Sequence, residues 1–253
     1  MAAMSYSPTE SPRQLIDQVR AAASARRSLR IIGGDTKAFY GQPVAGEPVS
    51  TSGWAGIVSH EPSELVVTVR AGTPLIELEA ALAEQGQCLP FEPPRFGPAS
   101  TIGGAVAAGL AGPARASAGG VRDYVLGVQF IDGRGEWLTF GGQVMKNVAG
   151  YDVSRVLAGS MGTLGILTDI SLKVLPVAPA EATLVFSLGQ HDALEQLHRW
   201  GGQPLPLNAS CWVKDQTQPD APELLFLRLR GAVAAVESAC ERLSREAGGT
   251  RMD

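Results

Sequence analysis

The chain has 253 residues, of which 45% are hydrophobic and 18% are charged, and its formal net charge is −4 at pH 7. This length suffices for one large domain or two modest ones with a sizeable core, and the negative charge argues against a nucleic-acid partner. Cys88, Cys211 and Cys240 lie far apart without a CxxC motif, which argues against an iron–sulfur or zinc site and favours a reducing compartment.

The first third of the chain predicts short helices and strands between glycine-rich turns. The opening residues, MAAMSYSPTE, lack a basic start followed by an apolar core, so we expect no signal peptide here. Ser11 and Pro12 predict the start of a helix that runs to about Arg27, because serine caps helices and proline fits their first position. We then expect a strand at 29–32, a loop to Pro48, a strand at 65–69 and a helix from 73 to 86.

Residues 88–122 are rich in proline, glycine and alanine, and such a long irregular stretch inside a domain is usually functional. Its longest apolar run, 102–111, is about half of what spans a bilayer. We therefore expect a cytosolic protein that reaches a membrane only through partners. Further along we expect a hairpin of strands 125–131 and 136–140, a short helix at 151–158 and a strand at 165–175.

Pro176, Pro179 and the alanines around them form the best candidate boundary. We predict two domains, residues 1–176 and residues 177–253. The second reads as strand (183–188), helix (191–200), strand (207–213), strand (222–230) and helix (231–247). This β-α-β-β-α order is close to a ferredoxin-like unit without its last strand, so we expect a short, incomplete α+β cap.

Three glycine clusters could be ordinary turns or anion-binding backbone. Glycine accepts φ > 0 and leaves no Cβ between a ligand and the N–H groups, and a following helix adds its N-terminal partial charge. None of the clusters fits the Rossmann or the P-loop pattern. Their spread over about 130 positions favours a long ligand held across two subdomains, such as a dinucleotide with a bulky ring. The clusters are Gly33-Gly34-Asp35-Thr36-Lys37, Ser100-Thr101-Ile102-Gly103-Gly104 and Gly162-Thr163-Leu164-Gly165.

Six segments carry a family resemblance: LRIIGGDTK (29–37), AGTPL (71–75), STIGGA (100–105), VRDYVLG (121–127), KNVAGYD (146–152) and GSMGTLGILT (159–168). In this order they resemble the vanillyl-alcohol-oxidase (PCMH-type) FAD-binding family. The resemblance covers roughly residues 25–176, and six motifs in sequence are far more specific than one. Within the family, GGDTKAFYG and KNVAGYDVSR look most like the smaller flavin-type subunit (the E subunit) of bacterial glycolate oxidase.

The resemblance implies an α+β fold, in which a two-subdomain PCMH-type FAD-binding domain precedes the ferredoxin-like cap. The first cluster would hold the pyrophosphate, the 98–104 loop and the 162–166 turn would lie along the rest of FAD, and 121–123 would approach the flavin. Ile102, Leu164 and Ile166 would offer the ring an apolar face. The cofactor-binding residues that we expect are Gly33, Gly34, Asp35, Thr36, Lys37, Pro98, Ser100, Thr101, Gly103, Gly104, Val121, Asp123, Gly162, Thr163, Gly165 and Ile166.

The sequence departs from the family in two places. Some members tether the flavin through histidine, or through histidine and cysteine, whereas the matching loop has Asp35 and Thr36; we therefore expect non-covalent FAD. Hydroxy-acid dehydrogenases of the family carry a histidine-rich metal and substrate site in a long cap. This chain has only His60, His191 and His198, for which we expect solvated or packing roles, so we expect no metal site and assign no catalytic residue.

Several other residues permit two readings. Lys146 and Arg155 could counter phosphate charge or be solvated at the surface. Tyr151 could stack near the flavin, although a core tyrosine is the favoured reading. Arg95 could face a carboxylate substrate or a partner. The charges of Asp17, Glu77 and Glu79 are structural charges on helix faces.

The function expected from the resemblance is that of an FAD-dependent oxidoreductase subunit. It would be the FAD-binding subunit of a glycolate (2-hydroxy acid) oxidase complex, with a larger flavin subunit and an iron–sulfur subunit as partners. That complex would oxidise glycolate to glyoxylate and pass electrons through flavin to the iron–sulfur partner. Two alternatives stay open: a non-catalytic assembly subunit of the same complex, and a free-standing FAD-dependent alcohol or hydroxy-acid oxidoreductase.

Overall fold

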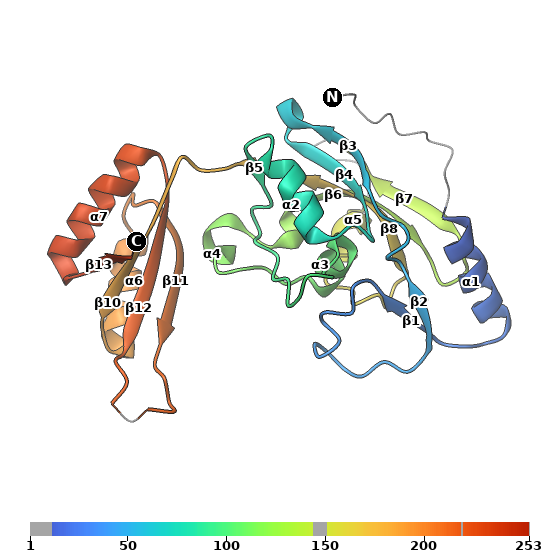
Figure 1. Ribbon diagram of the computed structural model, residues 1–253, viewed down its shortest axis with the longest axis horizontal. Helices are drawn as coiled ribbons and strands as arrows, with labels where there is room; N and C mark the ends of the chain where they lie inside the picture. The colour runs from blue at the N-terminus through green and yellow to red at the C-terminus, as the bar shows by residue number, and fades with distance from the viewer. Residues whose placement is uncertain (1–11, 144–150, 219, 253) are drawn as a thin grey trace. The chain divides into compact units, whose positions relative to one another are not determined.

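The computed structural model describes residues 12–143, 151–218 and 220–252 (Figure 1). They form two compact units. The first contains the residues up to 112 together with 120–176, and the second contains 113–119 together with the residues from 177 onward. Ser11, the expected helix cap, and Lys146 lie outside the described residues.

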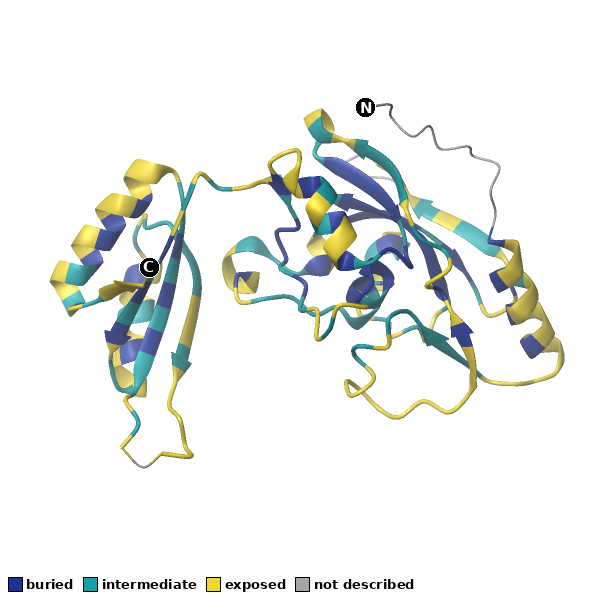
Figure 2. Ribbon diagram, viewed as in Figure 1, coloured by how far each residue is buried: buried dark blue, intermediate teal, exposed yellow. Residues whose placement is uncertain are grey.

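A five-stranded antiparallel sheet forms the centre of the first unit. Its order is β3 (Ile57–Glu61), β4 (Val66–Arg70), β8 (Ile166–Lys173), β6 (Val125–Ile131) and β7 (Trp137–Gly141). Because side chains alternate along a strand, Val67, Val69, Ile170 and Leu172 share one face. They form a core with helices α2 (Leu75–Ala83) and α3 (Ile102–Ala108), and the central strand β8 is buried along nearly its whole length (Figure 2).

The opposite face of the sheet is covered in part by a smaller lobe. Helix α1 (Arg13–Ser24) precedes the parallel strands β1 (Leu29–Ile32) and β2 (Glu47–Ser50). The apolar side chains of Leu15 and Val19, one helical turn apart, pack with Ile131 and Ile166 of the sheet. The loop expected up to Pro48 is present over 33–46, but it ends two residues early because β2 pairs with β1. The sequence predicted neither β2 nor β3.

Short elements connect these parts of the first unit. Strand β5 (Gln87–Cys88) pairs with β9 (Leu175–Pro176), and the 3-10 turns η1 (Pro62–Glu64) and η2 (Val121–Asp123) precede β4 and β6. The helix expected at 151–158 is the single turn α5 (Val153–Val156). The irregular stretch 88–122 contains α3 and the one-turn helix α4 (Arg115–Ala118).

The second unit alternates strands and helices. In chain order it has β10 (Ala180–Ser187), α6 (Gln190–Gly201), β11 (Leu207–Val213), β12 (Leu224–Gly231), α7 (Val233–Ala247) and β13 (Thr250–Met252). The sheet order β11-β12-β10-β13, antiparallel throughout, is compatible with a ferredoxin-like unit. The expectation of a missing last strand is wrong, because β13 pairs with β10.

The core of the second unit lies between its sheet and its two helices. The rings of Phe186 and Trp200, both fully buried, are 5.1 Å apart between centroids. Segment 113–119 belongs to this unit although it lies far from the rest in sequence: α4 packs against β11, and the Ser117 hydroxyl donates a hydrogen bond to the carbonyl oxygen of Asn208.

Candidate functional site

Three turns that are distant in sequence meet at a cleft of about 690 Å³ in the first unit. This volume lies within the range of about 300–1,000 Å³ that is usual for ligand sites. The lining comes from residues 29–38 and 40–44, from α3 and from the turn at 161–163. A smaller cavity of about 80 Å³ shares Gly33, Gly104 and Gly162 with the cleft and extends to Gly103 and Gly165.

The first two turns touch through their backbones. A Cβ at Gly34 would stand 1.5 Å from the carbonyl oxygen of Ala99, and a Cβ at Gly33 would stand 2.5 Å from Oγ1 of Thr101. Contacts this short are impossible for a real side chain. Glycine at 33 and 34 is therefore required for the 33–37 turn to lie against the 97–101 turn.

The third turn is held against α3 and β1. The N–H groups of Gly159 and Met161 each donate a 2.9 Å hydrogen bond, to the carbonyl oxygens of Val106 and Ala107. A Cβ at Gly162 would come within 3.2 Å of Ile31 in β1. All three glycine clusters thus converge on one cleft, although about 130 residues separate the first from the last.

The charges around the cleft favour an anion. Nζ of Lys37 donates a 2.7 Å hydrogen bond to Oγ of the buried Ser100, and burial lowers the pKa of Lys37. Arg30 lies on the strand that leads into the cleft and pairs with Asp35 at 2.7 Å. The two cations exceed the single carboxylate, so an anionic group would be attracted here and would also relieve the burial of the lysine charge.

The backbone of the 33–37 turn has N–H groups that are available to a ligand. Those of Gly34, Asp35, Thr36 and Lys37 donate no hydrogen bond within the described part of the chain. Asp35 and Met161, which both line the cleft, have φ of 53° and 54°, in the left-handed region that costs energy for residues other than glycine. Successive free N–H groups in such a turn form the concave nest that binds phosphate oxygens.

Most of the residues expected from the sequence meet here. Ser100 lies beneath the cleft as the partner of Lys37, and Gly103 and Gly165 line the smaller cavity. The expected residues that line the cleft itself are Gly33, Gly34, Asp35, Thr36, Lys37, Thr101, Gly104, Gly162 and Thr163.

Besides Ser100, four expected residues do not line either cavity. Val121 is buried in the sheet–helix core, and Asp123 accepts a 2.8 Å hydrogen bond from the N–H of Gly120 at the start of η2. Ile166 packs against the smaller lobe, and Pro98 is exposed on the far part of its turn. These residues occupy packing positions. A family motif marks a residue but does not tell whether its side chain packs in the core or contacts a ligand.

The expected apolar face is built from other residues. Ile102 and Ile166 are buried in the two cores of this unit, so they cannot present a surface to a ligand. Leu164 is exposed and does not line the cleft, whose apolar lining includes Ile31, Ala107 and Met161. Two features of the sequence could have identified these apolar lining residues: strand β1, which leads into the 33–37 turn, and the small residues of α3.

The structure also bears on Tyr151, Arg95 and Arg155, for which the sequence left two roles open. Tyr151 is 97% exposed, so the favoured reading as a core tyrosine is wrong. Arg95 pairs with Glu79, and Arg155 pairs with Asp152 at 3.1 Å.

None of the three histidines, all of which the structure describes, lines the cleft. His60 bonds Gln87 at 2.8 Å, and His191 lies 3.5 Å from Glu195 on the surface of α6. In the described ranges, no three His, Cys, Asp or Glu side chains gather as a metal site would require. Nor does any helix there have the length and apolar character needed to cross a bilayer.

Comparison with known proteins agrees with this geometry. A family model described as an FAD binding domain matches residues 8–141. The glycolate oxidase subunit GlcE of Escherichia coli (strain K12) is 46% identical over 232 residues, which are 92% of this chain and 64% of that protein. The glycolate oxidase subunit GlcD of Bacillus subtilis (strain 168) is 33% identical over 55% of this chain and 30% of its own length. The chain thus spans less than two thirds of either relative.

Among solved structures, an alkyldihydroxyacetonephosphate synthase matches 95% of this chain and 50% of its own, with a TM-score of 0.73 and 21% sequence identity. At this identity the likeness establishes the fold only.

Proposed function

We propose, from the premise that the chain belongs to the FAD-binding domain family, that it is the FAD-binding subunit of a glycolate (2-hydroxy acid) oxidase complex. The observation that carries the proposal is the convergence of three glycine turns on one cleft with a cationic rim. The similarity to a glycolate oxidase subunit over 92% of the chain supports the choice of complex.

The residues of the cleft fit a flavin dinucleotide. The free N–H groups of residues 34–37 and the cations Lys37 and Arg30 would hold the pyrophosphate. Gly104 and Gly162 leave room for the rest of the molecule, beside the apolar side chains of the lining. No histidine or cysteine lines the cleft within the described residues, which supports non-covalent binding.

Bound FAD would supply the two-electron oxidation chemistry, and the protein would bind it, orient it and keep water from its ring. The partners would be a larger flavin subunit, which would oxidise glycolate to glyoxylate, and an iron–sulfur subunit that accepts the electrons. The three cysteines, which lie far apart in the sequence without a CxxC motif, suit a reducing, cytosolic compartment, and any attachment to a membrane would pass through the complex.

The test is to purify the chain alone and together with the two partner subunits, and to count flavin and iron in each. We expect about one FAD in the isolated chain, seen as the visible absorption band of oxidised flavin. Addition of glycolate should bleach that band in the assembled complex.

Each outcome distinguishes a function. Flavin-free protein that still assembles would support the non-catalytic assembly subunit and overturn the proposal. Glycolate-dependent bleaching in the isolated chain would instead support the free-standing oxidoreductase.

A further inference from the structure

Lys37 has a defined position between the cleft and the 97–101 turn. Its Nζ donates a 2.7 Å hydrogen bond to Oγ of Ser100 and lies 5.9 Å from the centre of the Phe96 ring, a distance at which a cation is attracted to an aromatic face. The side chain also lines the cleft. An ammonium group carries three N–H donors, of which the described residues use one. Donors therefore remain for an anion in the cleft.

Ser100 is a fixed acceptor for this flexible side chain. The residue is only 1% exposed. Its carbonyl oxygen accepts a 2.8 Å hydrogen bond from the N–H of Leu75 at the start of α2, and its own N–H donates to the carbonyl oxygen of Gly97 at 3.3 Å. Because the hydroxyl is anchored on both sides, Lys37 is already ordered before a ligand arrives, and binding loses less side-chain freedom.

The turn before Ser100 keeps an aromatic ring next to the ammonium group. Phe96 has a φ of 55°, in the left-handed region that costs energy for a bulky residue. Its ring packs edge-on against Phe39, with 5.0 Å between the centroids. The neighbouring charge, Arg95, pairs with Glu79 of α2. The strained turn thus offers Lys37 a ring face, while its own charged residue is paired elsewhere.

The other charges that face Lys37 come from β1 and from its own turn. Arg30 and Asp35 pair with each other at 2.7 Å, and Tyr40 is the remaining titratable residue of the lining. Neither α3 nor the turn at 161–163 contributes a titratable side chain to the lining. Burial lowers the pKa of Lys37, and no carboxylate in the described part of the chain offsets this shift. The charged form of Lys37 is therefore destabilised until an anion binds.

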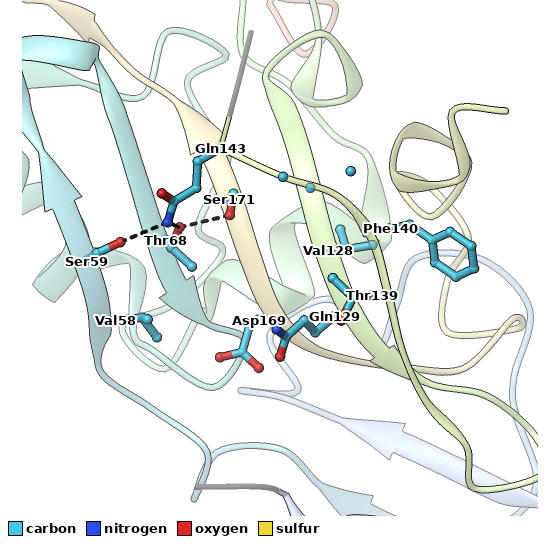
Figure 3. A pocket seen from close by; sticks show the side chains of 13 residues that line it. Val58, Ser59, Thr68, Val128, Gln129, Thr139, Phe140, Gln143, Asp169 and Ser171 are labelled. Carbon is cyan, nitrogen blue, oxygen red and sulfur yellow. Dashed lines mark hydrogen bonds between the residues drawn. The ribbon is translucent and has the colours of Figure 1, made fainter. Parts of the chain in front are cut away.

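A second buried titratable group of this unit lies apart from Lys37. Asp169, which is 4% exposed, lines a cavity of about 330 Å³ on the five-stranded sheet (Figure 3). That cavity shares no lining residue with the cleft. Burial raises the pKa of Asp169 from its ordinary 3.8, whereas it lowers the pKa of Lys37 from 10.5. An effect of alkaline pH on the cleft is thus expected from Lys37 and not from Asp169.

We propose that Lys37 is the residue through which pH controls the affinity of the cleft for FAD, and that Ser100 positions its ammonium group. This inference rests on the proposed function, since the pyrophosphate of FAD is the anion that Lys37 would meet. The ammonium form attracts phosphate and the neutral amine does not, so FAD binding to the neutral form takes up one proton from solvent. Affinity is therefore highest below the pKa of Lys37 in the flavin-free protein. It falls by up to about tenfold per pH unit above that pKa.

The test measures the Kd of FAD by fluorescence titration of the whole chain, freed of flavin, between about pH 7 and pH 10. We expect the affinity of the wild type to fall across this range. Lys37→Arg keeps its positive charge throughout, so its affinity should change less. The flavin ring and Tyr40 titrate in both proteins, and the difference between the two profiles belongs to Lys37. Lys214→Arg is the matched control, because Lys214 pairs with Glu223 in the second unit, and it should follow the wild type.

Ser100→Ala tests the positioning role. Loss of Oγ removes the acceptor of the ammonium group, so we expect roughly tenfold weaker FAD binding. The fall with pH should also begin at a lower pH, because the charged form loses a stabilising hydrogen bond. In a Lys37→Met background the same substitution should cost no further affinity, since no ammonium group is left to position. Equal losses in both backgrounds would show that Ser100 serves the fold only and would overturn its positioning role.

The outcomes separate this inference from the function on which it rests. Wild-type protein that binds no FAD at any pH would overturn both. FAD binding with the same pH profile in the wild type and in Lys37→Arg would overturn the inference alone. Lys37→Met gives a second comparison: it should bind FAD more weakly than the wild type at pH 7 and approach it at the alkaline end. Equal affinities at pH 7 would likewise overturn the role of the ammonium group.

Discussion

At the scale of single residues, the glycines of the cleft have a structural cause that the sequence did not reveal. The sequence suggested that they leave room for a ligand. The structure shows that Gly33 and Gly34 first of all leave room for the 97–101 turn. The same bare backbone then exposes the N–H groups of the following residues, so fold and binding depend on one feature.

Replacing Gly34 by alanine should therefore disrupt both. The new Cβ would stand 1.5 Å from the carbonyl oxygen of Ala99, so the two turns must separate. We expect a loss of about 1–3 kcal/mol of stability and loss of bound flavin, measured by urea unfolding and by the flavin-to-protein ratio. Gly53→Ala is the matched control, because nothing lies within 4 Å of its Cβ position. Full flavin content in Gly34→Ala would show that the contact between the turns is dispensable.

Gly104→Asp should separate binding from folding. Gly104 is the third residue of α3 and lines the cleft. A carboxylate in the first turn of a helix is favourable for the helix, but here it would repel a phosphate. We expect stability close to that of Gly104→Ala and loss of flavin only in the aspartate variant. Equal flavin content in both variants would contradict our placement of the phosphates.

Asp169 should give stability a distinct pH dependence. Because burial raises its pKa above the ordinary 3.8, the folded state holds this proton more tightly than the unfolded state. The contribution to stability is therefore complete below that ordinary value and is lost as pH rises through the raised pKa. The stability of Asp169→Asn relative to wild type should increase from acid to neutral pH, as measured by urea unfolding. A difference that does not change with pH would be inconsistent with a buried carboxyl group whose charge Thr168, Trp54 and Arg70 offset only in part.

At the scale of elements, the sequence predicted strongly patterned segments and missed short or interrupted ones. The strand at 29–32 is a short apolar run that ends at Gly33 and Gly34. The hairpin of β6 and β7 consists of two apolar runs joined by a glycine-containing turn at 132–135. Strand β2 was missed because Pro48 and the glycines before it indicate a loop, yet pairing with β1 and burial of Val49 outweigh that local preference. Strand β13 has three exposed residues and no pattern of its own, so only its pairing with β10 defines it.

Helix α3 offers a test of how an element supports the cleft. Its seven residues follow the N-cap Thr101, whose hydroxyl accepts a 3.2 Å hydrogen bond from the N–H of Gly104. Thr101→Val keeps the shape and removes this cap, so we expect a loss of about 1 kcal/mol together with weaker FAD binding, measured by unfolding and by flavin titration. Thr101→Ser keeps the hydroxyl and should stay close to wild type. If the valine variant binds FAD as tightly as the serine variant does, the cap does not position the helix for the ligand.

At the scale of the whole molecule, the spread of the glycine clusters suggested a dinucleotide, but single residues could be assigned to the site only through the family resemblance. Periodicity finds elements one at a time, whereas the cleft depends on contacts such as that of Gly34 with Ala99, which link residues far apart in sequence. The motifs placed nine of the expected residues on the cleft lining. They also included Val121 and Ile166, because a motif does not distinguish a residue that packs behind a site from one that faces it.

The two units should unfold in separate transitions, because each has its own hydrophobic core. Leu172 is fully buried in the first core and Leu227 nearly so in the second. Replacement of either by alanine should cost about 2–5 kcal/mol and lower only the transition of its own unit, as followed by calorimetry.

Every residue that lines the cleft belongs to the first unit. Added FAD should therefore raise only the transition that Leu172→Ala lowers, by about 2.7 kcal/mol of stability at a hundredfold excess over its Kd. If FAD raises the transition that Leu227→Ala lowers, the second unit contributes to binding, and the cleft of the first unit is not sufficient for it.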